Sequence, residues 1–150
     1  MSVEMAGNLK YQDVHLLIVD DDEISIRAIH RAISKMKLVN PVRVAHDGRH
    51  ALEILRGEAG EAKLAPPYIV LLDINMPRMN GHEFLAEIRN DDWLRRSVVF
   101  ILTTSDAPDD VRRAYGKNVA GYVVKDDLFE SLKRTLEVVD AFSRVVVLPD

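Results

Sequence analysis

The chain has 150 residues, a length that fits one domain with a sizeable hydrophobic core. It is 47% hydrophobic and 29% charged, as ordinary soluble globular proteins are, and its net charge of -4 gives no reason to expect nucleic-acid binding. The lack of cysteine excludes disulfides, thiol catalysis and thiolate metal sites. Because it also shows neither a signal-peptide core nor an apolar run of the roughly 20 residues that span a bilayer, we expect a cytoplasmic protein.

Short apolar runs rich in β-branched residues alternate with stretches of helical periodicity. This alternation is typical of an α/β fold with a parallel sheet. Five strands are predicted, at Val14–Val19, Val42–Ala45, Tyr68–Leu72, Val98–Leu102 and Gly121–Val124. Five helices are predicted, at Ile24–Met36, Gly48–Leu55, Phe84–Ile88, Asp109–Tyr115 and Leu128–Phe142. The third and fourth strands are almost wholly apolar, as expected of central strands that helices cover on both faces.

Residues at the ends of these segments support the predicted boundaries. Asp47 precedes the second helix as an N-cap, and Gly116 follows the fourth helix as a natural stop. Asp22 places a negative charge at the start of the first helix, where the helix dipole favours it. Trp93, in the connection after the third helix, is expected to be a packing anchor.

Two acidic clusters each follow an apolar strand-like run. The first is Asp20-Asp21-Asp22-Glu23, and the second centres on Asp73. Crowded carboxylates repel one another, and burying them is costly unless a cation or a proton compensates. Taken singly, each cluster is more often a solvated turn or a helix cap. Their joint placement at two strand ends instead favours a site for a hard divalent cation with oxygen ligands.

Other polar residues are expected at the same edge of the sheet, because function gathers at the carboxyl ends of parallel strands. Thr103 and Thr104 follow the fourth strand, and Lys125 follows the fifth. Three carboxylates, a hydroxyl and an ammonium on one edge suit a phosphoryl group. Mg²⁺ would bind carboxylates and a phosphate oxygen, Lys125 would pair with phosphate, and Thr104 would donate a hydrogen bond. One carboxylate can then act as a nucleophile toward phosphorus.

Four segments together resemble the receiver domain of two-component response regulators. They are residues 16–22, 71–81, 101–105 and 121–125, and the resemblance covers about residues 14–142. The motif Asp-x-x-Met-Pro-x-Met-Asn-Gly, which begins at Asp73, is a strong signal by itself. The resemblance implies a doubly wound, flavodoxin-like sheet of five parallel strands in the order 2-1-3-4-5, flanked by five helices.

The resemblance also implies a phosphoacceptor and a metal site. Asp73 matches the residue that accepts a phosphoryl group from a histidine kinase in the presence of Mg²⁺. Asp20 and Asp21 resemble the acidic pair that binds Mg²⁺, with Asp21 the direct ligand. Asp73 would be a further ligand, and Asn75 would contribute its backbone carbonyl.

Three later positions match the family's phosphate-sensing and switch residues. Thr104 matches the hydroxyl that senses the phosphoryl oxygen, Tyr122 the switching aromatic, and Lys125 the phosphate-pairing lysine. Receivers usually follow that lysine with proline, often in a cis peptide, whereas Asp126 stands here, so the loop after Lys125 is expected to differ. This departure and the Val-Val-Leu-Pro ending resemble the single-domain receivers that serve bacterial phytochromes, which are red-light-sensing histidine kinases.

The chain is expected to comprise an N-terminal extension (residues 1–13), a receiver domain (14–142) and an apolar C-terminal tail (143–150). The tail could fold back on its own core or pair with another protomer as an exposed strand. The phytochrome-type resemblance implies dimers and so favours a symmetric homodimer with the tail as a dimerisation arm. Since no effector domain follows, output would pass through protein contact or phosphorelay to a downstream phosphotransfer protein, with no role for nucleic acid or membrane.

Two other functions stay open. A small Mg²⁺-dependent phosphatase would also use an Asp nucleophile, but such enzymes typically need a second Asp two residues onward, where this chain has Asn75. A non-phosphorylated interaction module could retain the fold, although the complete set of site residues argues against it and only Asp126 leaves it open. We therefore expect a phosphoacceptor receiver and not an enzyme.

Overall fold

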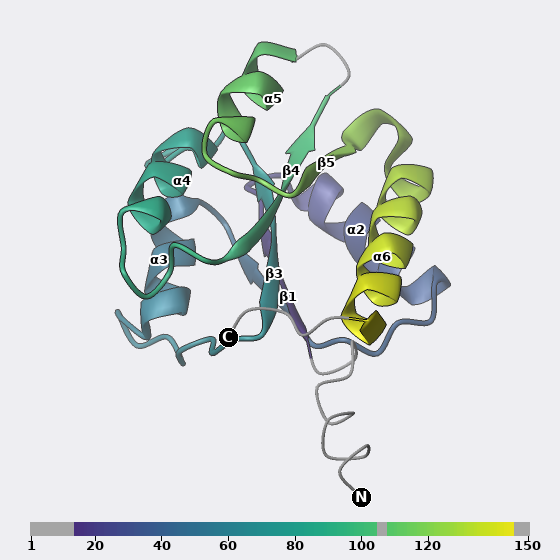
Figure 1. The fold of residues 1–150 in the computed structure, drawn as a ribbon, viewed down its shortest axis with the longest axis horizontal. Coiled ribbons are helices and arrows are strands. Elements are labelled where there is room, and N and C mark those ends of the chain that lie inside the picture. Colours follow the sequence, from purple (N-terminus) through teal and green to yellow (C-terminus); the bar gives the residue numbers. More distant parts are fainter. Residues whose placement is uncertain (1–13, 105–107, 146–150) are drawn as a thin grey trace, which may run out of the picture.

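The computed structural model describes residues 14–104 and 108–145, and in these residues one parallel sheet forms the centre of the molecule (Figure 1). Its strand order is β2-β1-β3-β4-β5, and every neighbouring pair is parallel. The strands are β1 (His15–Val19), β2 (Val42–Ala45), β3 (Tyr68–Asp73), β4 (Val98–Thr103) and β5 (Gly121–Val124). The predicted strand order and all five predicted strands are confirmed, with bounds that differ by at most one residue.

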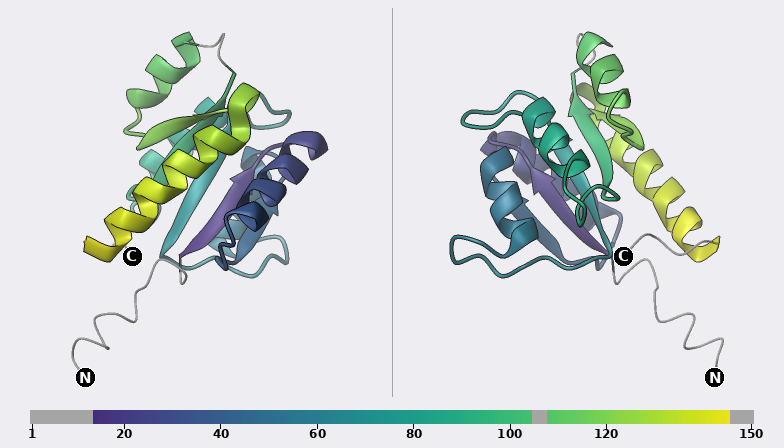
Figure 2. Two further views of the ribbon diagram at one scale, coloured as in Figure 1. Left: turned by 90° about the vertical axis from the view of Figure 1, so that its right-hand side faces the viewer. Right: turned by 60° about the vertical axis from the view of Figure 1, so that its left-hand side comes forward.

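Helices cover both faces of this sheet, as the two turned views make plain (Figure 2). The helices are α2 (Glu23–Lys35), α3 (Gly48–Arg56), α4 (Gly81–Arg89), α5 (Pro108–Tyr115) and α6 (Leu128–Val145). Helices α2 and α6 pack together on one face, and α3 and α4 pack on the other. A short 3-10 helix, η2 (Lys125–Asp127), joins β5 to α6. None of the described helices is both long and apolar enough to span a membrane.

The hydrophobic core is split by the sheet into two layers, because successive side chains of a strand point to opposite faces. Leu17 and Val70 belong to the layer beneath α3 and α4, whereas Leu16 and Leu71 belong to the layer beneath α2 and α6. All six residues of β3 are buried, which explains why this strand reads as a continuous apolar run until its final Asp73.

Side-chain caps begin three of the helices. Asp22 and Asp47 accept hydrogen bonds from backbone amides of α2 and α3, which confirms both predicted helix starts. Helix α4 begins three residues before the predicted Phe84, because Asn80 and Glu83 form a reciprocal capping box. The Asn80 side chain accepts from the Glu83 amide at 2.9 Å, and the Glu83 carboxylate accepts from the Asn80 amide at 3.0 Å.

Two expectations differ from the structure. Helix α6 continues to Val145, so residues 143–145 of the expected tail are helical, while residues 1–13 and 146–150 lie outside the described residues. Trp93 is 91% exposed, so its predicted packing role is wrong. The neighbouring Leu94 is buried instead, because the Asp91 carboxylate accepts from the Trp93 and Leu94 amides and sets the turn so that Leu94 faces the core.

Candidate functional site

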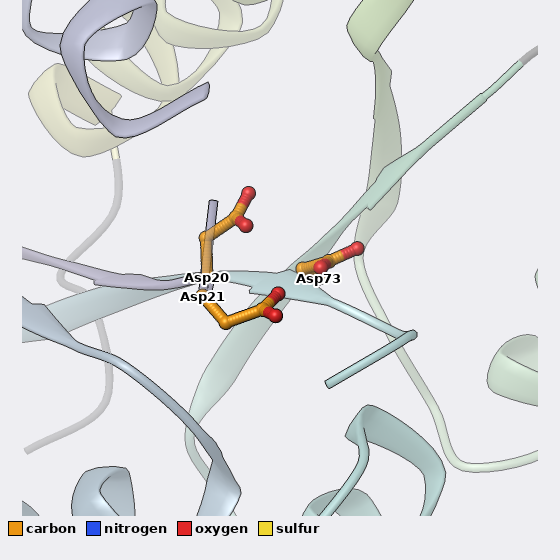
Figure 3. Close-up of side chains that lie close together, drawn as sticks. All are labelled: Asp20, Asp21 and Asp73. Atoms are coloured by element: carbon orange, nitrogen blue, oxygen red, sulfur yellow. The ribbon is translucent and has the colours of Figure 1, made fainter. Parts of the chain in front are cut away.

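Sheet register brings the two acidic clusters together at the carboxyl ends of the central strands. The β1–β3 pairing ends at Val19 and Leu72, so the next residues, Asp20 and Asp73, stand side by side. One carboxylate oxygen from each of Asp20, Asp21 and Asp73 lies within 4.8 Å of the others (Figure 3). The predicted convergence of the three carboxylates is therefore present in the structure.

Lys125 supplies the positive charge next to this cluster. Its Nζ lies 3.0 Å from Oδ2 of Asp20 and 3.3 Å from Oδ1 of Asp73. Asp20 is fully buried, and its other oxygen accepts a hydrogen bond from the Asp22 amide at 2.9 Å. One ammonium thus compensates two carboxylates from two different strands, and it leaves the site with an excess of negative charge.

This charge balance perturbs the protonation of the site. Burial, followed by the nearby Asp20 carboxylate, raises the pKa of Asp73 to about 6, although Lys125 opposes the shift. Burial acts to lower the pKa of Lys125, but Asp20 and Asp73 outweigh burial and raise it overall. Lys125 is therefore charged at neutral pH, and Asp73 is an unusually basic carboxylate with a high affinity for a proton or a cation.

The three carboxylates fit a hard divalent cation. All the donors are oxygen atoms, Asp20 and Asp73 are buried, and Asp21 is exposed at the mouth of the site. Mg²⁺ is typically bound by one or two carboxylates and keeps several waters, which this half-open arrangement permits. Asn75 is exposed two residues after Asp73, and its predicted role as a carbonyl ligand stays a prediction.

Glycine is required where α4 meets the end of β3. The Gly81 amide donates to the Ile74 carbonyl at 2.8 Å, so the helix start touches the backbone of the site. A Cβ at Gly81 would lie 2.6 Å from the Asp73 carbonyl oxygen and 2.8 Å from the Ile74 Cα. The Asn-Gly pair of the motif therefore caps the helix and lets it approach Asp73.

Thr104 directly follows strand β4, the neighbour of β3, and Tyr122 lies on the next strand, β5. Asp73 is in register with Leu102, so Thr104 follows β4 two residues beyond that point, and it is exposed. Tyr122 is in register with Ile101 on the edge strand β5 and is 48% exposed. Their roles as phosphoryl sensor and switching aromatic concern a phosphorylated state and stay predictions.

The connection after Lys125 is formed without a proline. Residues Lys125–Asp127 make a 3-10 turn, and the peptide bond before Asp126 is trans. The buried Ser131 hydroxyl accepts from the Val124 amide at 2.9 Å and so ties the first turn of α6 to the end of β5. The loop therefore brings Lys125 to the carboxylates although Asp126 replaces the usual residue.

Two contacts around the site were not predicted from the sequence. Arg78, in the loop after Asp73, forms an ion pair with the buried Asp47. His82, which is buried at the start of α4, lies with its Nε2 3.1 Å from the Asp110 carboxylate of α5. Charge alone could have marked Arg78 and Asp47 as a pair of opposite sign, but nothing in the spacing of the sequence joins them.

The chain is similar to proteins of one family over most of its length. The family model for the response regulator receiver domain matches residues 16–137. The probable methanogenesis regulatory protein FilR2 of Methanothrix harundinacea is 37% identical over 127 residues, which are 85% of this chain and 81% of that protein. Response regulator Rcp1 of Synechocystis sp. is 31% identical over 136 residues, which are 89% of this chain and 92% of Rcp1.

Solved structures of response regulators are also similar to this chain over most of its length. The phosphorylated cyanobacterial phytochrome response regulator RcpA matches with a TM-score of 0.76 and 31% identity, over 92% of this chain and 99% of RcpA. The Mn²⁺-bound form of Rcp1 matches with a TM-score of 0.74 and 28% identity, over 91% of this chain and 99% of Rcp1.

Proposed function

Because this chain belongs to the response regulator receiver domain family, we propose that Asp73 is the residue that accepts a phosphoryl group from a histidine kinase. The chain is a receiver-domain response regulator, similar to phytochrome response regulators. The observation that supports Asp73 is its position: a buried carboxylate with a pKa of about 6, beside two further carboxylates and 3.3 Å from the Lys125 ammonium.

The proposed chemistry is nucleophilic attack by a carboxylate oxygen of Asp73 on phosphorus. A P–O bond to Asp73 forms, the P–N bond to the kinase imidazole breaks, and the imidazole leaves with the electron pair and takes up a proton. Lys125 balances charge that develops on the phosphoryl oxygens. Mg²⁺, held by Asp20, Asp21, Asp73 and the Asn75 carbonyl, would supply further charge neutralisation at these oxygens.

The proposed output begins with the added charge, about -2 near neutral pH. The hydroxyl of Thr104 would move toward a phosphoryl oxygen, and Tyr122 would follow into the space that Thr104 leaves. This change would shift an equilibrium at the face formed by α5, β5 and α6. The signal would then pass by protein contact or by phosphotransfer to a downstream protein.

We also propose a partner and an assembly for the chain. Its similarity to RcpA and Rcp1 supports a phytochrome-type histidine kinase as the phosphoryl donor, which would place the reaction in the cytoplasm with the kinase's ATP. The apolar segment that ends the chain supports a homodimer in which this segment pairs between protomers. Light scattering of the whole chain and of a variant ending at residue 145 tests this, because the truncation should give monomers.

The phosphoacceptor is tested with Mg²⁺ and acetyl phosphate, followed by intact-mass analysis. We expect one phosphate per chain, stable in acid and removed by hydroxylamine as an acyl phosphate is. Asp73→Asn should take up none, whereas Asp92→Asn, at an exposed surface position, should react like the wild type. An adduct that survives Asp73→Asn would sink the assignment, and repeated turnover of a small phosphate ester would favour a phosphatase.

A further inference from the structure

The loop that follows Asp73 is tied to the start of α3. This loop, residues 74–80, carries Asn75 and is called here the β3–α4 loop. Within it, Arg78 extends across to Asp47, where its Nε lies 2.6 Å from Oδ2 and its Nη2 lies 3.1 Å from Oδ1. Both carboxylate oxygens are engaged, so the ion pair has the two-pronged geometry that fixes orientation as well as distance.

Asp47 is fixed independently of Arg78. It is 6% exposed, and its Oδ1 also accepts the His50 amide at 2.8 Å as the N-cap of α3. Burial acts to raise the pKa of Asp47, but the hydrogen bonds from Arg78 and from the His50 amide lower it overall. The carboxylate is therefore ionised at neutral pH and forms a rigid point to which the loop is attached.

The backbone of the loop is built to reach this point. Arg78 has a φ of 61°, a left-handed conformation that is uncommon for a residue other than glycine and that needs support from its surroundings. Beside it, the Gly48 amide donates to the Met79 carbonyl at 2.9 Å. A Cβ at Gly48 would lie 2.8 Å from that same oxygen, so only glycine permits this contact. Side chain and backbone thus hold the loop against α3 at adjacent positions.

We propose that Arg78 and Asp47 are positioning residues for the cation site: their ion pair holds the β3–α4 loop so that its Asn75 carbonyl is available to Mg²⁺ beside Asp21 and Asp73. The start of the loop is already fixed, because the Gly81 amide donates a hydrogen bond to the Ile74 carbonyl. A loop fixed at both ends loses less conformational freedom when a cation binds, and binding is tighter for that reason. This inference rests on the proposed function only in that Mg²⁺ is the cation.

The first test is the Mg²⁺ affinity of Arg78 variants, measured by calorimetric titration of the metal-free protein. Arg78→Ala should weaken Mg²⁺ binding about tenfold, the lower end of the range for groups that support metal ligands. The Mg²⁺ affinity of Arg78→Lys should fall between those of Arg78→Ala and the wild type, because lysine keeps the charge but not the two-pronged geometry of the guanidinium. The matched control is Arg43→Ala, which removes an arginine that also contacts a carboxylate, that of Glu61, away from the β3–α4 loop.

A second variant separates positioning from helix capping. Asp47→Asn keeps a side-chain oxygen for the His50 amide but removes the charge that Arg78 needs, so it should weaken Mg²⁺ binding as Arg78→Ala does. The double variant should lose no more Mg²⁺ affinity than either single variant, because the same ion pair is missing in all three. Hydrogen exchange of the backbone amides of residues 74–76 and 78–80, measured in EDTA, should be faster in Arg78→Ala and Asp47→Asn and unchanged in Arg43→Ala.

The outcomes distinguish this inference from the proposed function. If Arg78→Ala and Asp47→Asn unfold at lower temperature but bind Mg²⁺ as the wild type does, the pair is merely structural and the inference is overturned. If the wild type itself binds no Mg²⁺, the proposed metal site is wrong and this inference fails with it. If Arg78→Ala does not fold, Arg78→Lys and Asp47→Asn give the same comparison.

Discussion

The Lys125 ammonium lies 3.3 Å from a carboxylate oxygen of Asp73, and it joins the end of the edge strand β5 to the end of the central strand β3. The same ammonium contacts the fully buried Asp20 at 3.0 Å, while Asp21 adds a third carboxylate within reach of both. One positive charge therefore faces three negative ones. The first three predictions follow from this imbalance, because it destabilises the metal-free fold and attracts a cation.

Removing the charge of Asp73 should stabilise the metal-free protein. The pKa of about 6, against an ordinary 3.8, corresponds to a cost of ionisation of a few kcal/mol, since one pKa unit is about 1.4 kcal/mol. Asp73→Asn removes this cost but also loses the Lys125 contact, so we expect a net gain of about 1–2 kcal/mol in the free energy of unfolding in EDTA at pH 8. Denaturant unfolding measures it, with Asp92→Asn as an exposed control. If Asp73→Asn were less stable than the wild type, the inferred excess of negative charge at the site would be contradicted.

The stability contributed by Asp73 should depend on pH in the direction opposite to that of most carboxylates. Its folded pKa lies above its unfolded value, so the folded state binds the proton more tightly. The stabilising contribution of Asp73 is then fully present below about pH 4 and is lost as pH rises through about 6. In EDTA, the difference in stability between Asp73→Asn and the wild type should shrink as pH falls from 8 to 5. A difference that stays constant across this range would show that Asp73 titrates normally.

Replacing Lys125 should separate the metal affinity from the phosphoryl chemistry. Lys125→Met keeps most of the aliphatic side chain but leaves two buried carboxylates without their positive partner. In EDTA this should lower the free energy of unfolding by about 2–3 kcal/mol, somewhat less than the loss of one partner from a fully buried ion pair. Because the site becomes more negative, Mg²⁺ should bind at least as tightly, while phosphorylation by acetyl phosphate should slow. Lys117→Met, at an exposed position, is the control. Weaker Mg²⁺ binding in Lys125→Met would contradict this account of the site.

The close approach of α4 to Asp73, the proposed phosphoacceptor, predicts a large effect from a single methyl group. Gly81→Ala would place a Cβ 2.6 Å from the Asp73 carbonyl oxygen, so the helix or the strand end must shift. We expect a loss of about 1–3 kcal/mol in the free energy of unfolding, as for other overpacked positions, and slower phosphorylation. Gly116→Ala is the control, since the nearest atom to its added Cβ is 3.2 Å away. Equal stability of the two variants would show that the contact is easily relieved.

The convergence of the site could be predicted from the sequence because parallel strands bring their carboxyl ends to one edge. Asp20, Asp73 and Lys125 each follow an apolar run, so the topology alone places them near one another. Helix starts were predictable for a similar reason: Asp22 and Asp47 carry their own capping interaction, which depends only on residues two or three positions away.

Contacts between separate connections could not be predicted in this way. The pair of Arg78 and Asp47 depends on a left-handed backbone at Arg78 and on the packing of α3 beside the β3–α4 loop, and neither leaves a pattern in the sequence. The prediction that Trp93 is a packing anchor was wrong for a related reason. Hydrophobicity favours burial of Trp93 and Leu94 alike, and the turn fixed by Asp91 decides which of them faces the core.

The proposed switch residues, Thr104 and Tyr122, give a prediction that depends on the exposure of the Tyr122 side chain. Tyr122 is 48% exposed on the edge strand β5, next to β4, from whose end Thr104 continues. If phosphorylation draws Thr104 toward Asp73, Tyr122 should become less accessible to oxidation by hydroxyl radicals, as measured by mass spectrometry. Trp93, which is 91% exposed in the connection before β4, is an internal control whose oxidation should not change. Thr104→Ala should still be phosphorylated on Asp73 but should lose this protection, because it lacks the hydroxyl that is proposed to couple Asp73 to Tyr122. Equal oxidation of Tyr122 in both states of the wild type would exclude Tyr122 as the switching aromatic.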